Sequence, residues 1–241
     1  MESNGGVDKS FVKALVLSSI AVATLWWTPL LFPFRLLTTT VHELSHAIAV
    51  MGTGGTVQGF GVDYHGGGLV QATGGWPIVV YSAGYLGSTL FGGTMLLIAK
   101  NAKGRRRALR FVGLATAVVL AFAGLMRAYR NGSLFDIVVF NDLWAFGIVA
   151  LIVGALLLVA SKAHDLIVAI VCYTIAVLSV LYAAFDLVNV FTSAISPLGG
   201  FNDARGLASA THVPAVIWAV LWCLVAAAIV WRFLRAALRP R

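Results

Sequence analysis

The stretch His42-Glu43-Leu44-Ser45-His46 decides how this chain folds and what chemistry it can support. On a helix, residues four positions apart lie on one face about 6 Å from each other, so both imidazoles can reach one metal ion. Glu43 follows the first histidine and is close enough to act as a general base on a metal-bound water. The spacing therefore predicts metal-assisted hydrolysis, with His42 and His46 as metal ligands and Glu43 as the catalytic residue.

The surroundings of these five residues sharpen that prediction. They lie in the second apolar run, residues 34–53, which is long enough to enter a membrane. Ionisable side chains are costly there, so a functional site is the default interpretation. The alternative is a helix whose polar side chains only bond to neighbouring helices. That alternative accounts for Thr38, Thr39 and Thr40, but not for two histidines and a glutamate at this spacing.

The composition excludes a soluble enzyme. Of 241 residues, 60% are hydrophobic and 11% are charged, whereas soluble domains carry roughly 25% charged residues. The mean hydropathy is +0.92. The apolar runs predict an all-α polytopic membrane protein of about seven transmembrane helices, with a glycine-rich β-hairpin after the second. Cys172 and Cys223 each lie within an apolar run and are expected to be buried small hydrophobes.

The basic residues indicate membrane orientation rather than nucleic-acid binding. The net charge is +8, but its lysines and arginines cluster in residues 100–110 and at the C-terminus, as expected of cytoplasmic segments. No nucleic acid is therefore expected as a partner. Seven spans with both basic segments inside place the N-terminus outside, although Lys9 and Lys13 argue against that orientation.

Residues 52–75 hold ten glycines in twenty-four positions and predict the hairpin. An open strand edge cannot face lipid, so this segment must be paired, lie at an interface or line a cavity, where a substrate segment can add as a strand. His65 lies at the expected turn and is interpreted as a solvated histidine. In the next span, Gly84, Ser88 and Gly92 recur every four residues and form a small-residue face for close approach to the metal-bearing helix.

Three segments in this order resemble the site-2 protease family of intramembrane zinc metallopeptidases. They are His42 to Ala47, the glycine-led strand Gly54 to Phe60, and Ser82 to Ser88, all within residues 36–99. Tyr182 to Leu187 and Asn202 to Ala204 are similar to segments of the branch with the smaller chains. Tyr85 stands where the family has Pro, Ser88 stands where it has Asn, and no Leu-Asp-Gly motif, which supplies the family's third ligand, occurs.

The third metal ligand is open between two aspartates. Zinc sites used in hydrolysis generally have three protein ligands and one water. Asp186 is favoured, because it lies inside a span on a polar stripe with Tyr182, Asn189 and Ser193. Asp203 is the rival, because the preceding Pro197 to Asn202 is similar to the Pro-rich approach to the family's aspartate.

The resemblance implies an intramembrane zinc (Zn²⁺) metalloendopeptidase with transmembrane protein substrates, hydrolysed in or near their membrane segments. His42, His46 and Asp186 would hold the metal, and Glu43 would act on zinc-bound water. Residues 1–10 are expected to be a disordered tail and residues 11–241 a single integral membrane metallopeptidase domain, with its core in 34–99 and 166–212. The short chain suggests a bacterial plasma membrane.

Two other functions are compatible with the same residues. A non-proteolytic metal- or client-binding membrane protein of the same fold would explain the absent motif and the replaced Pro and Asn. A transporter with a proton relay through His42, Glu43 and Asp186 predicts paired repeats with broken helices, and no convincing internal repeat is present.

Overall fold

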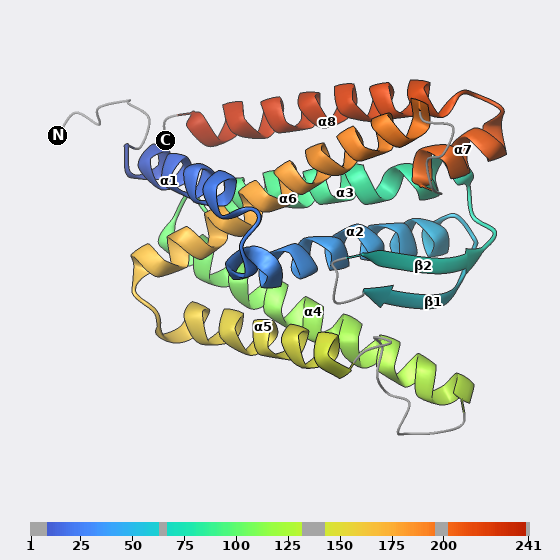
Figure 1. Ribbon diagram of the computed structural model, residues 1–241. Helices are drawn as coiled ribbons and strands as arrows, with labels where there is room; N and C mark the ends of the chain where they lie inside the picture. Colours follow the sequence, from blue (N-terminus) through green and yellow to red (C-terminus); the bar gives the residue numbers. More distant parts are fainter. Residues whose placement is uncertain (1–8, 63–66, 132–142, 196–201, 240–241) are drawn as a thin grey trace.

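The computed structural model describes residues 9–62, 67–131, 143–195 and 202–239, with some helical side chains outside the description. The elements follow one another along the chain in this order (Figure 1): α1 (Lys9–Leu25), the short 3₁₀ helix η1 (Pro29–Leu31), α2 (Phe32–Gly52), β1 (Thr56–Val62), β2 (Gly68–Thr73), α3 (Pro77–Ile98), α4 (Ala102–Asn131), α5 (Leu143–Lys162), α6 (Asp165–Ile195), α7 (Asp203–Thr211) and α8 (Ala215–Leu238). The protein is mostly helical, as the sequence predicts. The predicted N-terminal tail lies largely outside the described residues, and α1 begins at Lys9.

Within the described residues, two helical stretches are long and apolar enough to cross a membrane, namely Asp165–Tyr182 in α6 and Ala215–Leu238, which is α8. Shorter apolar stretches are Val12–Leu25 and Ala150–Lys162. Only 11% of the α8 stretch is buried inside the protein, against 56% of the α6 stretch. Large apolar side chains such as Leu224 therefore project outward from α8, where lipid, unlike water, accommodates them.

The main apolar core gathers around α6. Tyr173, Ile175 and Ala176 of α6 pack with buried residues of α3, α4 and α5, and Cys172 is buried among them. Cys223 is exposed on α8, so the expectation that both cysteines are buried is wrong for this one. The reason is its position on a helix most of whose surface faces outward.

The two strands form an antiparallel sheet in the glycine-rich segment, with Thr56 opposite Thr73 and Val62 opposite Gly68. Residues 63–66, including His65 at the expected turn, lie outside the described part of the chain. Gly54, Gly74 and Gly75 have φ values of 82°, 75° and 84° at the base of the sheet, a conformation that residues with a Cβ rarely adopt. This base returns the chain beside α2, so that the sheet lies along the C-terminal part of that helix (Figure 1).

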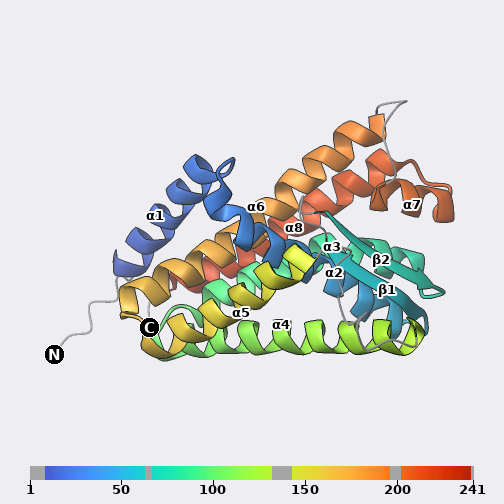
Figure 2. The same cartoon turned by 60° about the horizontal axis from the view of Figure 1, so that its bottom comes forward.

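The start of α1, the turn between α3 and α4 and the end of α8 lie at one end of the helical bundle (Figure 1). Lys100 connects two of them, because its Nζ donates to the carbonyl oxygens of Ala236 at 3.2 Å and Arg239 at 3.1 Å. Figure 2 shows that α1 and α2 advance in the same direction along the bundle rather than doubling back. The start of α1, at Lys9, therefore lies at the same end of the bundle as the basic segments, and the side of the membrane on which the N-terminus lies stays a sequence prediction.

Side-chain caps mark the starts of α4 and α7. Most of the basic segment 100–110 belongs to α4, whose first turn is capped by the Asn101 side chain accepting from Gly104 N at 2.5 Å. The polar segment 196–212 contains α7, which begins after Asn202, whose Oδ1 accepts from Arg205 N at 3.0 Å. In both places a side-chain cap satisfies backbone donors that would otherwise be unpaired.

Candidate metal centre

Helix α2 presents His42, Glu43 and His46 as buried residues. One helical turn separates the histidines, and their Nε2 atoms lie 3.0 Å apart. Hydroxyl groups on α2 bond within the helix: Thr40 donates to the carbonyl of Leu36 at 2.8 Å and Ser45 to that of Val41 at 2.7 Å. The hydroxyl groups of Thr40 and Ser45 therefore have their hydrogen-bond acceptors within α2 itself. The two imidazoles instead point toward a common point.

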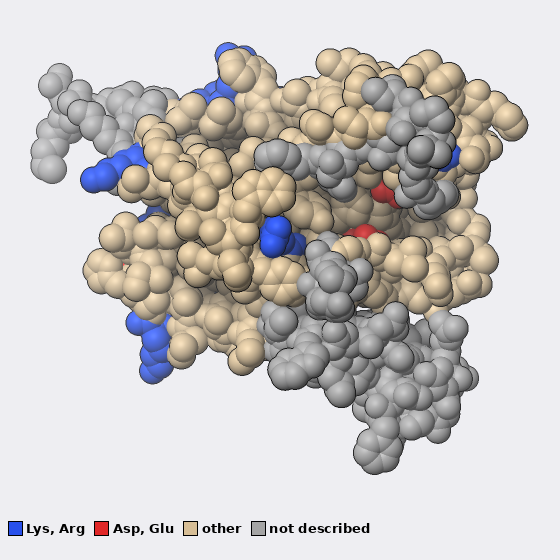
Figure 3. All heavy atoms as spheres, in the orientation of Figure 1, with Lys and Arg blue, Asp and Glu red and all other residues tan. Residues whose placement is uncertain are grey.

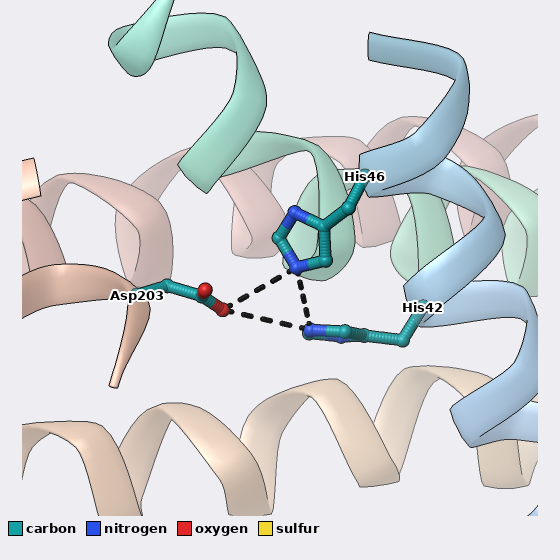
Figure 4. A group of neighbouring side chains, drawn as sticks. All are labelled: His42, His46 and Asp203. Atoms are coloured by element: carbon teal, nitrogen blue, oxygen red, sulfur yellow. Dashed lines mark hydrogen bonds and ion pairs between the residues drawn. The ribbon is translucent and has the colours of Figure 1, made fainter. Parts of the chain in front are cut away.

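Asp203 completes the cluster from the opposite side (Figure 4). It is the first residue of α7, and its Oδ2 lies 3.6 Å from His42 Nε2 and 3.4 Å from His46 Nε2. The two histidine side chains are 8% and 7% exposed and the Asp203 side chain is 21% exposed, so the cluster is closed on the histidine side and more open at the carboxylate.

Of the two aspartates that the sequence offers, the structure brings Asp203 to the histidines. His42, His46 and Asp203 are a group whose ligand atoms all lie within 4.8 Å of one another. Asp186 belongs to α6, but its side chain lies outside the described part of the chain. Its role as a ligand therefore remains a sequence prediction.

The donor set fits zinc. In a tetrahedral site with ligand bonds of about 2.0–2.1 Å, neighbouring donor atoms lie about 3.3 Å apart. The three separations here are 3.0, 3.4 and 3.6 Å. Two imidazole nitrogens and one carboxylate oxygen are also the donor set of hydrolytic zinc sites, which leave the fourth position for water.

Hydrogen bonding prepares one of the two imidazoles for this role. His46 Nδ1 lies 2.7 Å from the carbonyl oxygen of Val80 on α3. A carbonyl only accepts, so Nδ1 carries the proton and Nε2 keeps its lone pair for a metal. The sequence gives no sign of this contact, because a backbone carbonyl can be supplied by any residue type.

Gly84 makes room at the centre, since α3 passes directly behind the two histidines. A Cβ at this position would collide with the Nε2 atoms of both His42 and His46. The next small residue, Gly87, is equally close to the Ser45 side chain. The predicted small-residue face thus meets α2 at Gly84, whereas Gly92 meets α6 through Ala176 and Val180.

Substitution Gly84→Ala is expected to lower zinc affinity at least about tenfold, because the added methyl displaces the two ligating nitrogens. Gly154→Ala is the matched control, because a Cβ added to this glycine of α5 would have no heavy atom within 4 Å. Competition with a chromophoric chelator measures the affinity. Equal zinc affinity in the two variants would contradict the close packing of α3 on the centre.

The sheet reaches the predicted catalytic base. Glu43 is buried, and a Cβ on Gly68, the first residue of β2, would collide with its side chain, 2.5 Å from Cγ and 2.7 Å from Cδ. The β2 backbone therefore lies directly against the Glu43 carboxylate group. This contact explains why position 68 requires a glycine. The glycine-rich composition of the segment does not by itself identify which glycine has this role.

Substitution Gly68→Ala is expected to reduce peptide hydrolysis at least about tenfold while leaving zinc content unchanged, because it moves the base and not the ligands. Gly59→Ala is the control within the same sheet: its Cβ would lie 3.1 Å from the flexible end of the Gln71 side chain. Hydrolysis rate and zinc content are measured on the same preparations. Loss of zinc from Gly68→Ala would show that the sheet supports the ligands instead.

Comparison with known proteins identifies the family of the chain. The family model described as peptidase M50B-like matches residues 15–233, nearly the whole chain. Searches of curated proteins and of solved structures found no match. The matched range includes α2, the sheet, α3 and α7, and it confirms the resemblance to the site-2 protease family. The chain therefore belongs to the peptidase M50B-like family of membrane metallopeptidases.

Proposed function

We propose that the protein is an intramembrane zinc endopeptidase, with His42, His46 and Asp203 as the metal ligands. The observation that carries this proposal is the cluster of their three ligand atoms within 4.8 Å, on a helix that also carries Glu43. The contacts favour Asp203 over Asp186, the ligand that the sequence alone favours. Family membership supports the peptidase activity.

Zinc at this centre would polarise the scissile carbonyl and make the attacking water more acidic. Glu43 takes a proton from that water and passes it to the leaving amine, as a general base and then a general acid. The Val80 carbonyl holds the His46 ring in the ligating tautomer. The β2 backbone at Gly68 restricts where the Glu43 carboxylate can lie.

Substrates are proposed to be transmembrane segments of other proteins. In the space-filling view, atoms of Asp or Glu are visible inside a hollow between α2 and α6, and most described atoms around it belong to residues that are neither acidic nor basic (Figure 3). Each described strand pairs with one neighbour within the sheet. A substrate helix must unwind to expose its peptide bond, and pairing with a strand edge offsets part of that loss of hydrogen bonds.

The membrane is proposed to be a bacterial plasma membrane, crossed by the long helices with the basic end in the cytoplasm. The start of α1, the α3–α4 turn and the end of α8 share that end, which agrees with the excess of positive charge on cytoplasmic segments. The sequence predicts about seven spans, and we propose that these helices enter the membrane without each of them crossing it. The reason is that α1 and α2 advance in the same direction along the bundle, so the two together account for one crossing.

The test is hydrolysis of synthetic transmembrane peptides by the purified protein in detergent, with cleavage products identified by mass spectrometry. The proposal predicts internal cleavage that a zinc chelator stops. Zinc binding without any cleavage across a broad peptide set would instead favour the non-proteolytic metal- or client-binding function.

A further inference from the structure

The two histidines of the centre are held in different ways. His46 donates from Nδ1 to the Val80 carbonyl at 2.7 Å. His42 is equally buried, yet its Nδ1 has no hydrogen-bond partner among the described residues. A ligating imidazole without such a bond needs another constraint on its ring orientation, because rotation about its side-chain bonds would carry Nε2 away from the shared point.

Ring packing supplies that constraint. The Tyr85 ring lies 4.9 Å from the His42 ring at an interplanar angle of 84°, an edge-to-face contact. Tyr85 is 2% exposed, so the surrounding protein fixes its own position. Edge-to-face arrangements are favoured for aromatic rings because the positive edge of one meets the negative face of the other.

Helix α8 supports Tyr85 in turn. The Trp222 ring stacks on Tyr85 with centroids 5.0 Å apart and an interplanar angle of 26°. The Trp222 indole is itself fixed, because Nε1 donates to Ser82 Oγ at 2.8 Å. A continuous set of contacts thus leads from α8 through α3 to the His42 ligand on α2.

We infer that Tyr85 and Trp222 are positioning residues, which hold His42 in its ligating orientation by ring packing where His46 is held by a hydrogen bond. The inference rests on the proposed metal centre and adds to it a role for α8, which contributes none of the three ligands. It also gives a reason for a large aromatic residue at position 85, one residue after Gly84, which must be small.

The competing explanation is that both rings only fill the core, since they belong to an apolar cluster with Leu187, Val190 and Leu207. The two explanations differ in what a ring-free replacement does to the metal. Tyr85→Leu keeps an apolar side chain but removes the ring contact, whereas Tyr85→Phe keeps the ring. Core filling predicts changes in folding stability alone, and positioning predicts a change in metal binding.

The experiment compares Tyr85→Leu, Tyr85→Phe and Trp222→Leu with the full-length wild-type protein in detergent. Trp218→Leu is the matched control, because Trp218 lies one turn earlier on α8, packs against the same cluster and donates instead to Thr211 Oγ1 at 3.2 Å. Three readouts are taken: zinc affinity by chelator competition, the visible absorption spectrum of the Co²⁺-loaded protein, and the melting temperature of the metal-free protein.

Tyr85→Leu is expected to bind zinc about tenfold more weakly and to show an altered Co²⁺ spectrum, because the geometry of one ligand is relaxed. Trp222→Leu is expected to change both readouts in the same direction, while Tyr85→Phe and Trp218→Leu retain wild-type zinc affinity and spectrum. Wild-type affinity and spectrum in Tyr85→Leu, with only a lower melting temperature, would overturn the positioning role and leave the proposed peptidase intact. A wild-type protein that binds no zinc would overturn both.

Discussion

Replacing Glu43 with Gln is expected to lower peptide hydrolysis by about 10² to 10⁴-fold, the range that general acid–base catalysis contributes. The amide has nearly the same size as the carboxylate and can still pack against Gly68, but it cannot accept a proton from water at neutral pH. Because Glu43 is not one of the three clustered ligands, zinc content is expected to remain at the wild-type value. The hydrolysis rate is measured with a transmembrane peptide that the wild-type protein cleaves, and the zinc content is measured by metal analysis of the same sample.

The control is Ser45→Ala on the same helix, whose hydroxyl bonds only to the Val41 carbonyl among the interactions that the structure gives. It is expected to cleave at a rate close to wild type. Cleavage by Glu43→Gln at the wild-type rate would remove Glu43 from the mechanism and turn attention to a non-proteolytic role.

Removal of the metal is expected to lower hydrolysis about 10³-fold or more, because a metal ion supplies several kcal/mol of transition-state stabilisation. Dialysis against a zinc chelator, followed by addition of Zn²⁺, should abolish and then restore cleavage. Mg²⁺ should not restore it, because two imidazoles and one carboxylate suit zinc, whereas magnesium prefers an all-oxygen octahedral site.

The melting temperature should change with the metal as well, since a ligand that binds only the folded state stabilises it. The metal-free protein is therefore expected to melt at a lower temperature than the zinc-loaded protein. Cleavage that continues unchanged after complete metal removal would contradict a zinc-dependent mechanism.

The sequence predicts the core of the site because its signals are local. His42, Glu43 and His46 lie within about one helical turn, so the 3.6-residue period alone brings the two imidazoles together. The small-residue face at Gly84 is equally predictable, because helices approach closely only where side chains are small. The mostly helical fold follows from the apolar runs.

The third ligand is harder to predict, because its contact joins residues far apart in the chain. Asp186 is favoured by a polar stripe on one helix, a local pattern, whereas Asp203 belongs to α7, far along the chain from the two histidines that it approaches. The segment around Asp203 looks like a polar loop in sequence. Asn202 is a residue type that favours a helix N-cap, and it caps α7 here. A cap residue does not reveal that the helix after it packs near α2, so the sequence alone does not bring Asp203 to the histidines.

Contacts that depend on orientation also lie beyond the sequence. The packing of Gly68 against Glu43 and of Tyr85 against His42 depends on where β2 and α3 lie in space. Periodicity identifies the faces of such elements but not their neighbours. From the sequence, Tyr85 can be recognised only as a departure from the family pattern and is given no role, whereas Ser88 is also part of the predicted small-residue face.

The most direct test of the zinc centre is the zinc content of three proteins purified without chelators: the wild type, Asp203→Ala and Asp186→Ala. We expect close to one zinc per chain in the wild type and in Asp186→Ala, and loss of zinc in Asp203→Ala, because its carboxylate oxygen lies 3.6 and 3.4 Å from the two histidine nitrogens. Zinc retained by Asp203→Ala and lost from Asp186→Ala would contradict the proposed ligand set, and a wild type without zinc would contradict the metal centre itself.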